Sequence, residues 1–182
     1  MNPFLVASGL ALRIDTGFPW TRAQITQGFG KRGAFIGLYE TASFTRHQLA
    51  GGLSYRWLDK GWAIDTDLLV GATLQGGPNP QKGTSAETRI KIQKNKGRIQ
   101  PWLNLGVRPT LLVNQFDIDA SDGPRTEYSV DYKLSYSAGL GLDWRSPKGW
   151  GIGLGFDLPQ IDTPSISIPG LHLSVSWGER VR

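Results

Sequence analysis

His172 and Ser174 are the residues whose types and spacing come nearest to catalytic chemistry in this chain of 182 residues. They lie two positions apart, so on a β-strand they would share one face, where an imidazole can activate a hydroxyl as a nucleophile. The spacing is common by chance, and a polar pair that lines an interior is the favoured interpretation. The other histidine, His47, takes the opposite, outward parity near a predicted loop.

The residues needed for cysteine chemistry, metal binding or nucleic-acid binding are missing or are not arranged for it. The chain has no cysteine, which rules out disulfides, thiolate catalysis and a cysteine zinc site. The loop 117–123 is acidic, but its glycine comes one place late for a calcium loop and the closing glutamate is missing, so no metal or cofactor is expected. The net charge of +5 comes from Lys and Arg scattered along the chain, which argues against nucleic-acid binding.

Charged residues recur instead at alternate positions, opposite runs of apolar residues. If the apolar side faces lipid, these charges line the interior of a barrel, where they must pair with each other or contact water. The predicted lumen-lining residues are Arg13, Arg22, Arg56, Asp65, Asp67, Arg89, Lys91, Arg98, Arg108, Asp131, Lys133, Asp143 and Arg145. Basic groups outnumber acidic ones in this set, which predicts a net basic lumen.

The elements that position these charges are strands, because apolar and polar residues alternate with a period of two. From Val6 to Ile14 the even positions are mostly apolar, and the start of the chain is interpreted as this first strand rather than as a signal peptide. Nine more alternating segments follow. They are 21–30, 34–44, 46–57, 62–75, 88–94, 98–113, 128–145, 150–158 and 166–177.

Four short turns that carry Lys and Gly join pairs of these segments: 31–33, 59–61, 95–97 and 147–149. Longer links are expected at 76–87, 114–127 and 159–165. Short turns at one end and longer loops at the other are typical of outer-membrane barrels, and an even strand number brings both termini to the short-turn end. The count is about ten, with eight as the alternative.

Tryptophans gather beside the short turns, on the apolar parity. Tryptophan is enriched where a membrane meets water, so these side chains predict an interfacial girdle. They are Trp57, Trp62, Trp144, Trp150 and Trp177. The sequence therefore predicts an all-β, single-domain (1–182), up-and-down antiparallel transmembrane β-barrel. Two alternatives stay open, a soluble lipid- or ligand-binding barrel with its apolar face inside, and a designed or engineered barrel.

The chain resembles small, porin-like β-barrels of the Gram-negative outer membrane. Its last strand, 170–177, alternates and closes on Trp177, like the terminal signal of such barrels, although residues 178–182 follow it. The resemblance implies an outer-membrane location, contact with a lipid bilayer, lipopolysaccharide or detergent, and periplasmic termini. It leaves the oligomeric state open.

The expected function is a small passive channel that passes anionic solutes, or a structural or adhesive barrel with an ion-paired lumen. Two families of outer-membrane enzymes do not fit these residues. Outer-membrane lipid A deacylases use a His-x-Ser pair, but His172 and Ser174 take the inward parity. Ten-stranded outer-membrane proteases set paired Asp residues and an Asp-His couple at the outer rim. Their strands project far beyond the membrane, for which this chain is too short, and no histidine of this chain is positioned to join an acidic pair. The chain is therefore not expected to be an enzyme.

Overall fold

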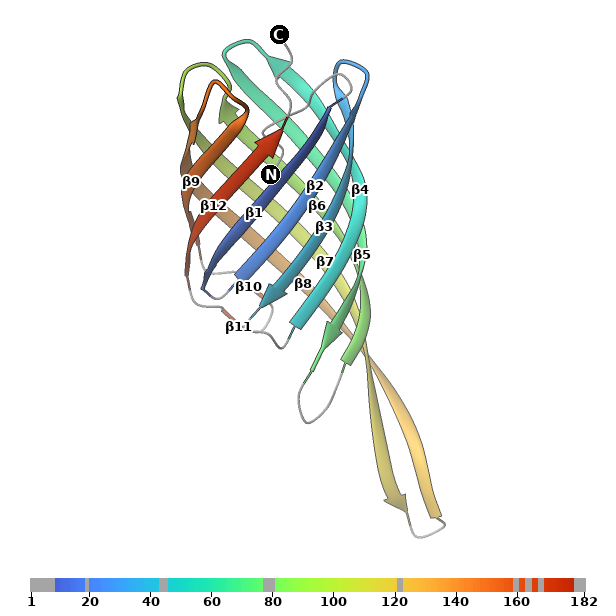
Figure 1. Ribbon diagram of the computed structural model, residues 1–182. Helices are drawn as coiled ribbons and strands as arrows, with labels where there is room; N and C mark the ends of the chain where they lie inside the picture. The colour runs from blue at the N-terminus through green and yellow to red at the C-terminus, as the bar shows by residue number, and fades with distance from the viewer. Residues whose placement is uncertain are drawn as a thin grey trace.

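A computed structural model describes residues 9–18, 20–42, 46–76, 81–120, 123–158, 161–162, 165–166 and 169–178, with the backbone alone at 117–120, 124, 161–162 and 165–166. Ten long strands form a tilted barrel (Figure 1). They are β1 (Leu10–Phe18), β2 (Trp20–Phe29), β3 (Gly33–Ala42), β4 (Arg46–Asp59), β5 (Trp62–Gln75), β6 (Gln81–Lys94), β7 (Ile99–Ala120), β8 (Gly123–Arg145), β9 (Trp150–Asp157) and β12 (Gly170–Gly178).

The strands form a closed ring of antiparallel neighbours. From β1 to β9 each strand pairs with the next in the chain, and β12 closes the ring by pairing with both β9 and β1. Two short strands lie at the loop end: β10 (Ile161–Asp162) pairs with β8 at Tyr136, and β11 (Ser165–Ile166) pairs with β10. The predicted up-and-down barrel is confirmed, with ten strands in the ring rather than eight.

The Lys-Gly turns lie together at one end of the barrel, where β1 begins and β12 ends. Gly61, Gly97 and Gly149 take positive φ angles of 83°, 89° and 90°, which L-residues with a side chain rarely adopt. The first turn differs from the prediction, because its left-handed glycine is Gly30 (φ 63°) and Gly33 already belongs to β3.

The loop end departs from the sequence prediction in two places. The link expected at 76–87 is much shorter, because β6 begins at Gln81 and pairs with β5 along its whole length. The link expected at 114–127 is mostly strand, since β7 and β8 stay paired from Ile99–Trp144 to Ala120–Gly123. This long hairpin projects from the barrel on the side away from the short turns (Figure 1). Charge and turn residues concealed these strands, because the side chains described at 115–116 and 125–127 are exposed and no buried face imposes a strong alternation at those positions.

The barrel has an apolar outer face and a polar interior. In β1, Leu12 and Ile14 are exposed whereas Arg13 and Asp15 are buried, and the other strands repeat this pattern. This orientation excludes a carrier barrel that keeps its apolar side within. Among the described residues, no helix is long and apolar enough to cross a bilayer. A small apolar patch does face inward, where Leu38 and Ile36 of β3 meet Ala50 and Leu69.

A charge placed on the outer face tests whether that face contacts lipid. Leu68, near the middle of β5, is 56% exposed, while Leu58 lies beside a short turn. We expect Leu68→Arg to lower the free energy of unfolding from vesicles by about 2–4 kcal/mol, and Leu58→Arg to lower it by about 0–1 kcal/mol, because the cost of a charge on the lipid face depends on its depth. Denaturant titration in lipid vesicles measures both, with Leu68→Ala as the uncharged control. Equal costs at the two sites would contradict the membrane-spanning orientation.

Candidate functional site: the barrel interior

An ion-pair cluster fills the loop-end half of the interior. Arg108 of β7 contacts two carboxylates: its Nη1 lies 3.0 Å from Glu40 Oε1, and its Nη2 lies 3.0 Å from Glu87 Oε2. Arg22 of β2 also binds Glu40, with 2.5 Å between Nη2 and Oε2. We call Arg22, Glu40, Glu87 and Arg108 the outer cluster. Glu40 and Glu87 are buried, as is Arg108, so the charges balance one another out of bulk water.

The outer cluster spans the barrel rather than joining neighbours alone. In the ring, β3 and β7 are separated by β4, β5 and β6 on one side and by five strands on the other. Because Glu40 lies on β3 and Arg108 on β7, their ion pair crosses the interior close to its full width. A solute that moved along the barrel axis would meet this bridge.

A second cluster bridges the interior nearer the short turns. Arg13 of β1 donates from Nε to Asp15 (2.7 Å) and from Nη1 to Asp143 of β8 (2.8 Å). The indole N–H of Trp102 also donates to Asp143, at 3.3 Å. We call Arg13, Asp15, Trp102 and Asp143 the inner cluster. It reaches over β9 and β12, which separate β1 from β8 in the ring.

Trp102 is seated on glycines of β8 and β9. Gly141 and Gly155 lie directly opposite each other in the ladder. A Cβ at Gly141 would come 2.5 Å from Trp102 Cζ2, and a Cβ at Gly155 would come 2.8 Å from the same atom. The ring of His172 stacks on Trp102 with centroids 6.0 Å apart. These two glycines therefore make room for an inward side chain and do not widen a pore.

Further charges complete the interior wall. Arg56 pairs with Asp65 through Nε and Oδ1 at 2.7 Å, and Arg89 Nη2 lies 3.4 Å from Asp67 Oδ2. Lys91 is buried, and its Nζ has no hydrogen-bond partner within the described part of the chain. The interior thus carries charge along most of its described length.

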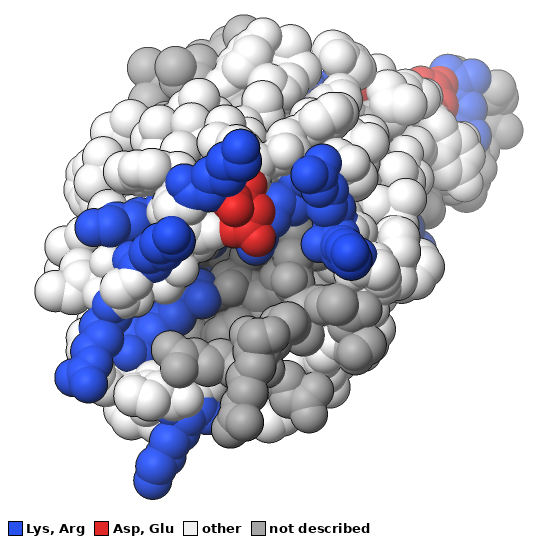
Figure 2. Space-filling model, turned by 90° about the horizontal axis from the view of Figure 1, so that it is seen from above, with Lys and Arg blue, Asp and Glu red and all other residues white. Residues whose placement is uncertain are grey.

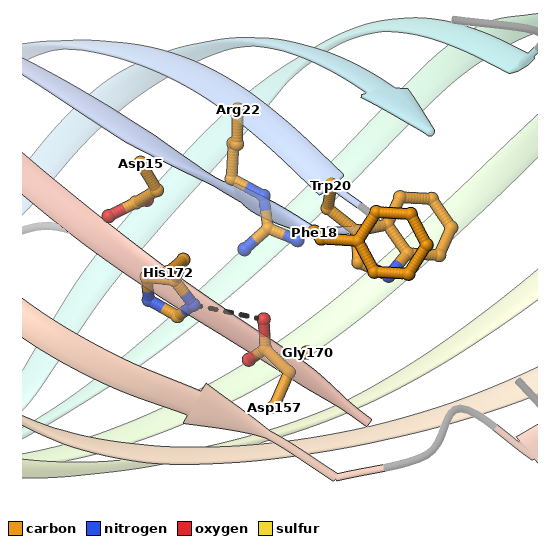
Figure 3. Close-up of a pocket in the computed structure, with 7 residues that line it drawn as sticks. All are labelled: Asp15, Phe18, Trp20, Arg22, Asp157, Gly170 and His172. Carbon is orange, nitrogen blue, oxygen red and sulfur yellow. Dashed lines mark ion pairs between the residues drawn. The ribbon is translucent and has the colours of Figure 1, made fainter. Parts of the chain in front are cut away.

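A small cavity lies at the loop end of the interior (Figure 3). His172 Nδ1 lies 3.2 Å from Asp157 Oδ2, and both side chains point into the cavity with Asp15 and Arg22. The cavity measures about 20 Å³, which holds about one water molecule. No histidine is predicted from the sequence to join an acidic pair, yet His172 lies beside Asp157 in a cavity that Asp15 also lines. The β9–β12 pairing brings Gly155 opposite His172 and so places Asp157 nearby.

Most of the predicted lumen residues lie inside the ring, but three do not line it as expected. Arg98 is exposed in the turn before β7, because the strand begins one residue later. Asp131 is exposed and Lys133 is half-buried, since β8 continues beyond the ring into the projecting hairpin. Those placed inside are Arg13, Arg22, Arg56, Asp65, Asp67, Arg89, Lys91, Arg108, Asp143 and Arg145.

Sequence reasoning missed Glu40 and Glu87, the two partners of Arg108. The signal was present for Glu87, which shares the parity of Arg89 and Lys91 on β6. On β3, Glu40 shares the inward side with Ile36 and Leu38. Because those two residues are apolar, this side of the strand resembles a lipid-facing side in the sequence.

Both missed residues are acidic, so they add to the acidic side of the interior charge. Arg22, Arg56 and Arg145 also lie inside the ring but are half-buried. The buried acidic residues are Asp15, Glu40, Asp65, Asp67, Glu87 and Asp143, and the buried basic residues are Arg13, Arg89, Lys91 and Arg108.

The five predicted interface tryptophans lie at the short-turn end, on the outward parity. Trp57, Trp62, Trp150 and Trp177 are exposed, and Trp144 packs on Trp150 with ring centroids 5.1 Å apart. Trp57 sits at a β-bulge opposite β5 and donates to Thr66 Oγ1 at 3.0 Å.

Lys and Arg dominate the rim at this end, which Figure 2 views from above. The exposed basic residues there are Lys31, Arg32, Lys60, Lys94, Lys96, Arg98 and Lys148. This rim lies beside the tryptophans, so aromatic rings and positive charges meet at one level of the barrel.

A closed strand ring with a continuous apolar exterior, a charged interior and aromatic residues at its end is the arrangement that spans lipid bilayers. The fold is that of a transmembrane β-barrel. No group of His, Cys, Asp or Glu within the described residues could hold a metal ion.

No protein-family model and no curated protein matches the chain. Among solved structures it is similar to the N-terminal β-barrel domain of Pseudomonas aeruginosa OprF, at 10% identity over 94% of this chain and 96% of that one (TM-score 0.42). It is also similar to the KdgM porin in complex with disordered oligogalacturonate, at 12% identity over 94% and 99% (TM-score 0.40). A third similar structure is the outer membrane protein OpdK from Pseudomonas aeruginosa, with 9% sequence identity over 96% of this chain and 67% of that one (TM-score 0.26).

The outer cluster predicts a strong dependence of stability on Arg108. We expect Arg108→Met to lower the free energy of unfolding by about 3–5 kcal/mol, because Glu40 and Glu87 would keep buried charges without their shared partner. Arg125→Met is the matched control, since Arg125 pairs with Glu127 at 3.0 Å while both are exposed, and its loss should cost less than about 1 kcal/mol. Denaturant titration measures both variants. A similar loss of unfolding free energy in Arg108→Met and Arg125→Met would show that Arg108 does not form a buried ion pair across the barrel.

Proposed function

We propose that this chain is an outer-membrane β-barrel, not an enzyme, whose ion-paired interior is closed to solutes and whose role is to anchor the projecting β7–β8 hairpin outside the membrane. The observation that carries the proposal is the Arg108 bridge from β7 to Glu40 on β3. A wall-lining charge in an open pore would face water, whereas these groups are buried against each other.

The two clusters block the interior at different depths. The outer cluster lies toward the loop end, and the inner cluster joins Arg13 to Asp143 nearer the short turns. Ten strands enclose an interior that is about a quarter wider than that of the eight-stranded barrels that side chains fill. Two cross-lumen bridges, together with Trp102 lying on its glycines, are therefore enough to exclude solutes.

The orientation follows from the two ends of the barrel. Outer-membrane barrels keep short turns on the periplasmic side and extend longer elements outward. This supports periplasmic termini and an extracellular hairpin. The exposed basic rim beside the tryptophans suits contact with anionic lipid headgroups, which attract Lys and Arg near a membrane surface.

The strands of the β7–β8 hairpin are longer than a membrane-spanning strand needs to be. A tilted strand crosses a membrane with about 9–11 residues, whereas β7 has 22 residues and β8 has 23. The segment of β8 before Leu134 therefore lies beyond the span that begins at Trp144. We infer that this excess is the part of the chain that meets other molecules.

Ion conductance in planar bilayers tests the closed interior. We expect no discrete steps from the wild-type protein, and steps from a variant that combines Arg13→Ser, Glu40→Ser, Arg108→Ser and Asp143→Ser, because the small side chains remove both bridges. Folding of each protein is checked by its heat-dependent electrophoretic migration. Regular steps from the wild type would overturn the proposal and favour the small channel, whose anion or cation preference would then report the net charge of the lumen.

A further inference from the structure

The projecting hairpin leaves one edge of β8 open. On the side away from β7, β9 pairs with β8 only from Gly139 to Arg145, and β10 pairs with it at Ser135 and Tyr136. Within the part of the chain that the structure describes, no strand pairs with this side of residues 127–133. An open strand edge is a template for pairing with another strand.

The backbone groups at this edge belong to Tyr128, Val130 and Tyr132. Leu158 N donates to Ala138 O at 2.8 Å, whereas Arg145 N donates to Arg98 O beside β7. Even-numbered residues of β8 thus point their N–H and C=O groups away from β7, and the β7–β8 register has no shift that would reverse this. The three side chains are also 68%, 66% and 62% exposed, so both backbone and apolar surface are available.

We propose that this edge binds the same edge of a second copy of the chain, as an antiparallel pair centred on Val130. In this register Val130 faces Val130, and Tyr128 of each copy faces Tyr132 of the other. These cross-strand pairs join aromatic and β-branched side chains, which stabilise sheets. The apolar faces of the two hairpins would then form one continuous surface.

Charge on the opposite face selects the same register. With Val130 at the centre, Glu127 of each copy faces Lys133 of the other. Moving the centre to Ser129 would place Glu127 opposite Asp131, and moving it to Asp131 would place two Asp131 side chains together. Like charges directly opposite destabilise a sheet, so the Val130 register is favoured over both.

The contacts within one hairpin are compatible with this pairing. Glu127 Oε1 lies 3.0 Å from Arg125 Nη2, and both side chains are about half exposed. Asn114 donates to Asp131 Oδ2 at 2.7 Å and to Ser129 at 3.1 Å, which holds these side chains on the polar face. Glu127 can therefore meet Lys133 of a second copy without breaking a buried interaction.

The antiparallel arrangement decides how the two barrels are placed. Each β8 runs from the hairpin tip toward its own barrel, so antiparallel strands put the barrels at opposite ends of the joint sheet. Since the hairpin projects away from the barrel end (Figure 1), the two copies would sit in facing membranes. The inference rests on the proposed display of the hairpin outside the membrane, but not on whether the interior conducts.

Clustering of vesicles that carry the protein tests the proposal, because contact between facing membranes joins vesicles. We expect wild-type proteoliposomes to cluster in light scattering. Glu127→Lys alone and Lys133→Glu alone should each slow clustering about tenfold or more, since each turns two attractive cross-strand pairs into repulsive ones. A mixture of Glu127→Lys vesicles with Lys133→Glu vesicles should cluster again, because opposite charges then face each other at both positions.

Lys82→Glu is the matched control, since it makes the same charge change on exposed β6 at the loop end and should leave clustering unchanged. Wild-type vesicles that carry folded protein and stay dispersed would overturn the proposal. So would single reversals that cluster like the wild type, or a mixture that fails to recover, both of which would indicate another surface or a different partner. Conductance in planar bilayers is measured independently of vesicle clustering. A failure of the clustering proposal therefore does not bear on whether the barrel interior is closed.

Discussion

Closure of the strand ring is the constraint on which the rest of this structure depends. In a bilayer no water is available to backbone groups, so an open sheet edge within the membrane would leave them without partners. Pairing of β12 with both β1 and β9 removes that edge. Once the ring is closed, every strand must present one face to lipid and the other to a narrow interior, and the alternation of side chains follows from that division.

The narrow interior determines how the charges behave. Isolated charges there would be costly, and the chain meets this cost by pairing them across the barrel as well as along it. Arg108 holds Glu40 and Glu87, and Arg13 holds Asp15 and Asp143. The same pairs that make the charges tolerable also cross the interior from one strand to another.

The projecting part of the β7–β8 hairpin lies beyond the closed ring, so the need to pair every strand edge within the bilayer does not apply to it. Beyond the membrane span its strands need no neighbours to satisfy the bilayer, and water or another chain can pair with the open edge. Apolar side chains on an exposed edge favour pairing with another strand, and Tyr128, Val130 and Tyr132 are exposed there.

Particular residues show which features of the structure the sequence predicts. The alternation in β5 and the Lys-Gly turns identified a barrel, its even strand number and the outward side of Trp62 or Trp150, because parity is a local property that lipid and lumen impose along each strand. Pairing between distant strands is not local. The bridge from Arg108 to Glu40, the place of His172 beside Asp157 and the free edge at Val130 depend on register around the whole ring, and on where each strand outruns its neighbours. The sequence therefore determined which side chains face inward in most strands, and the tertiary structure alone decided which of them meet.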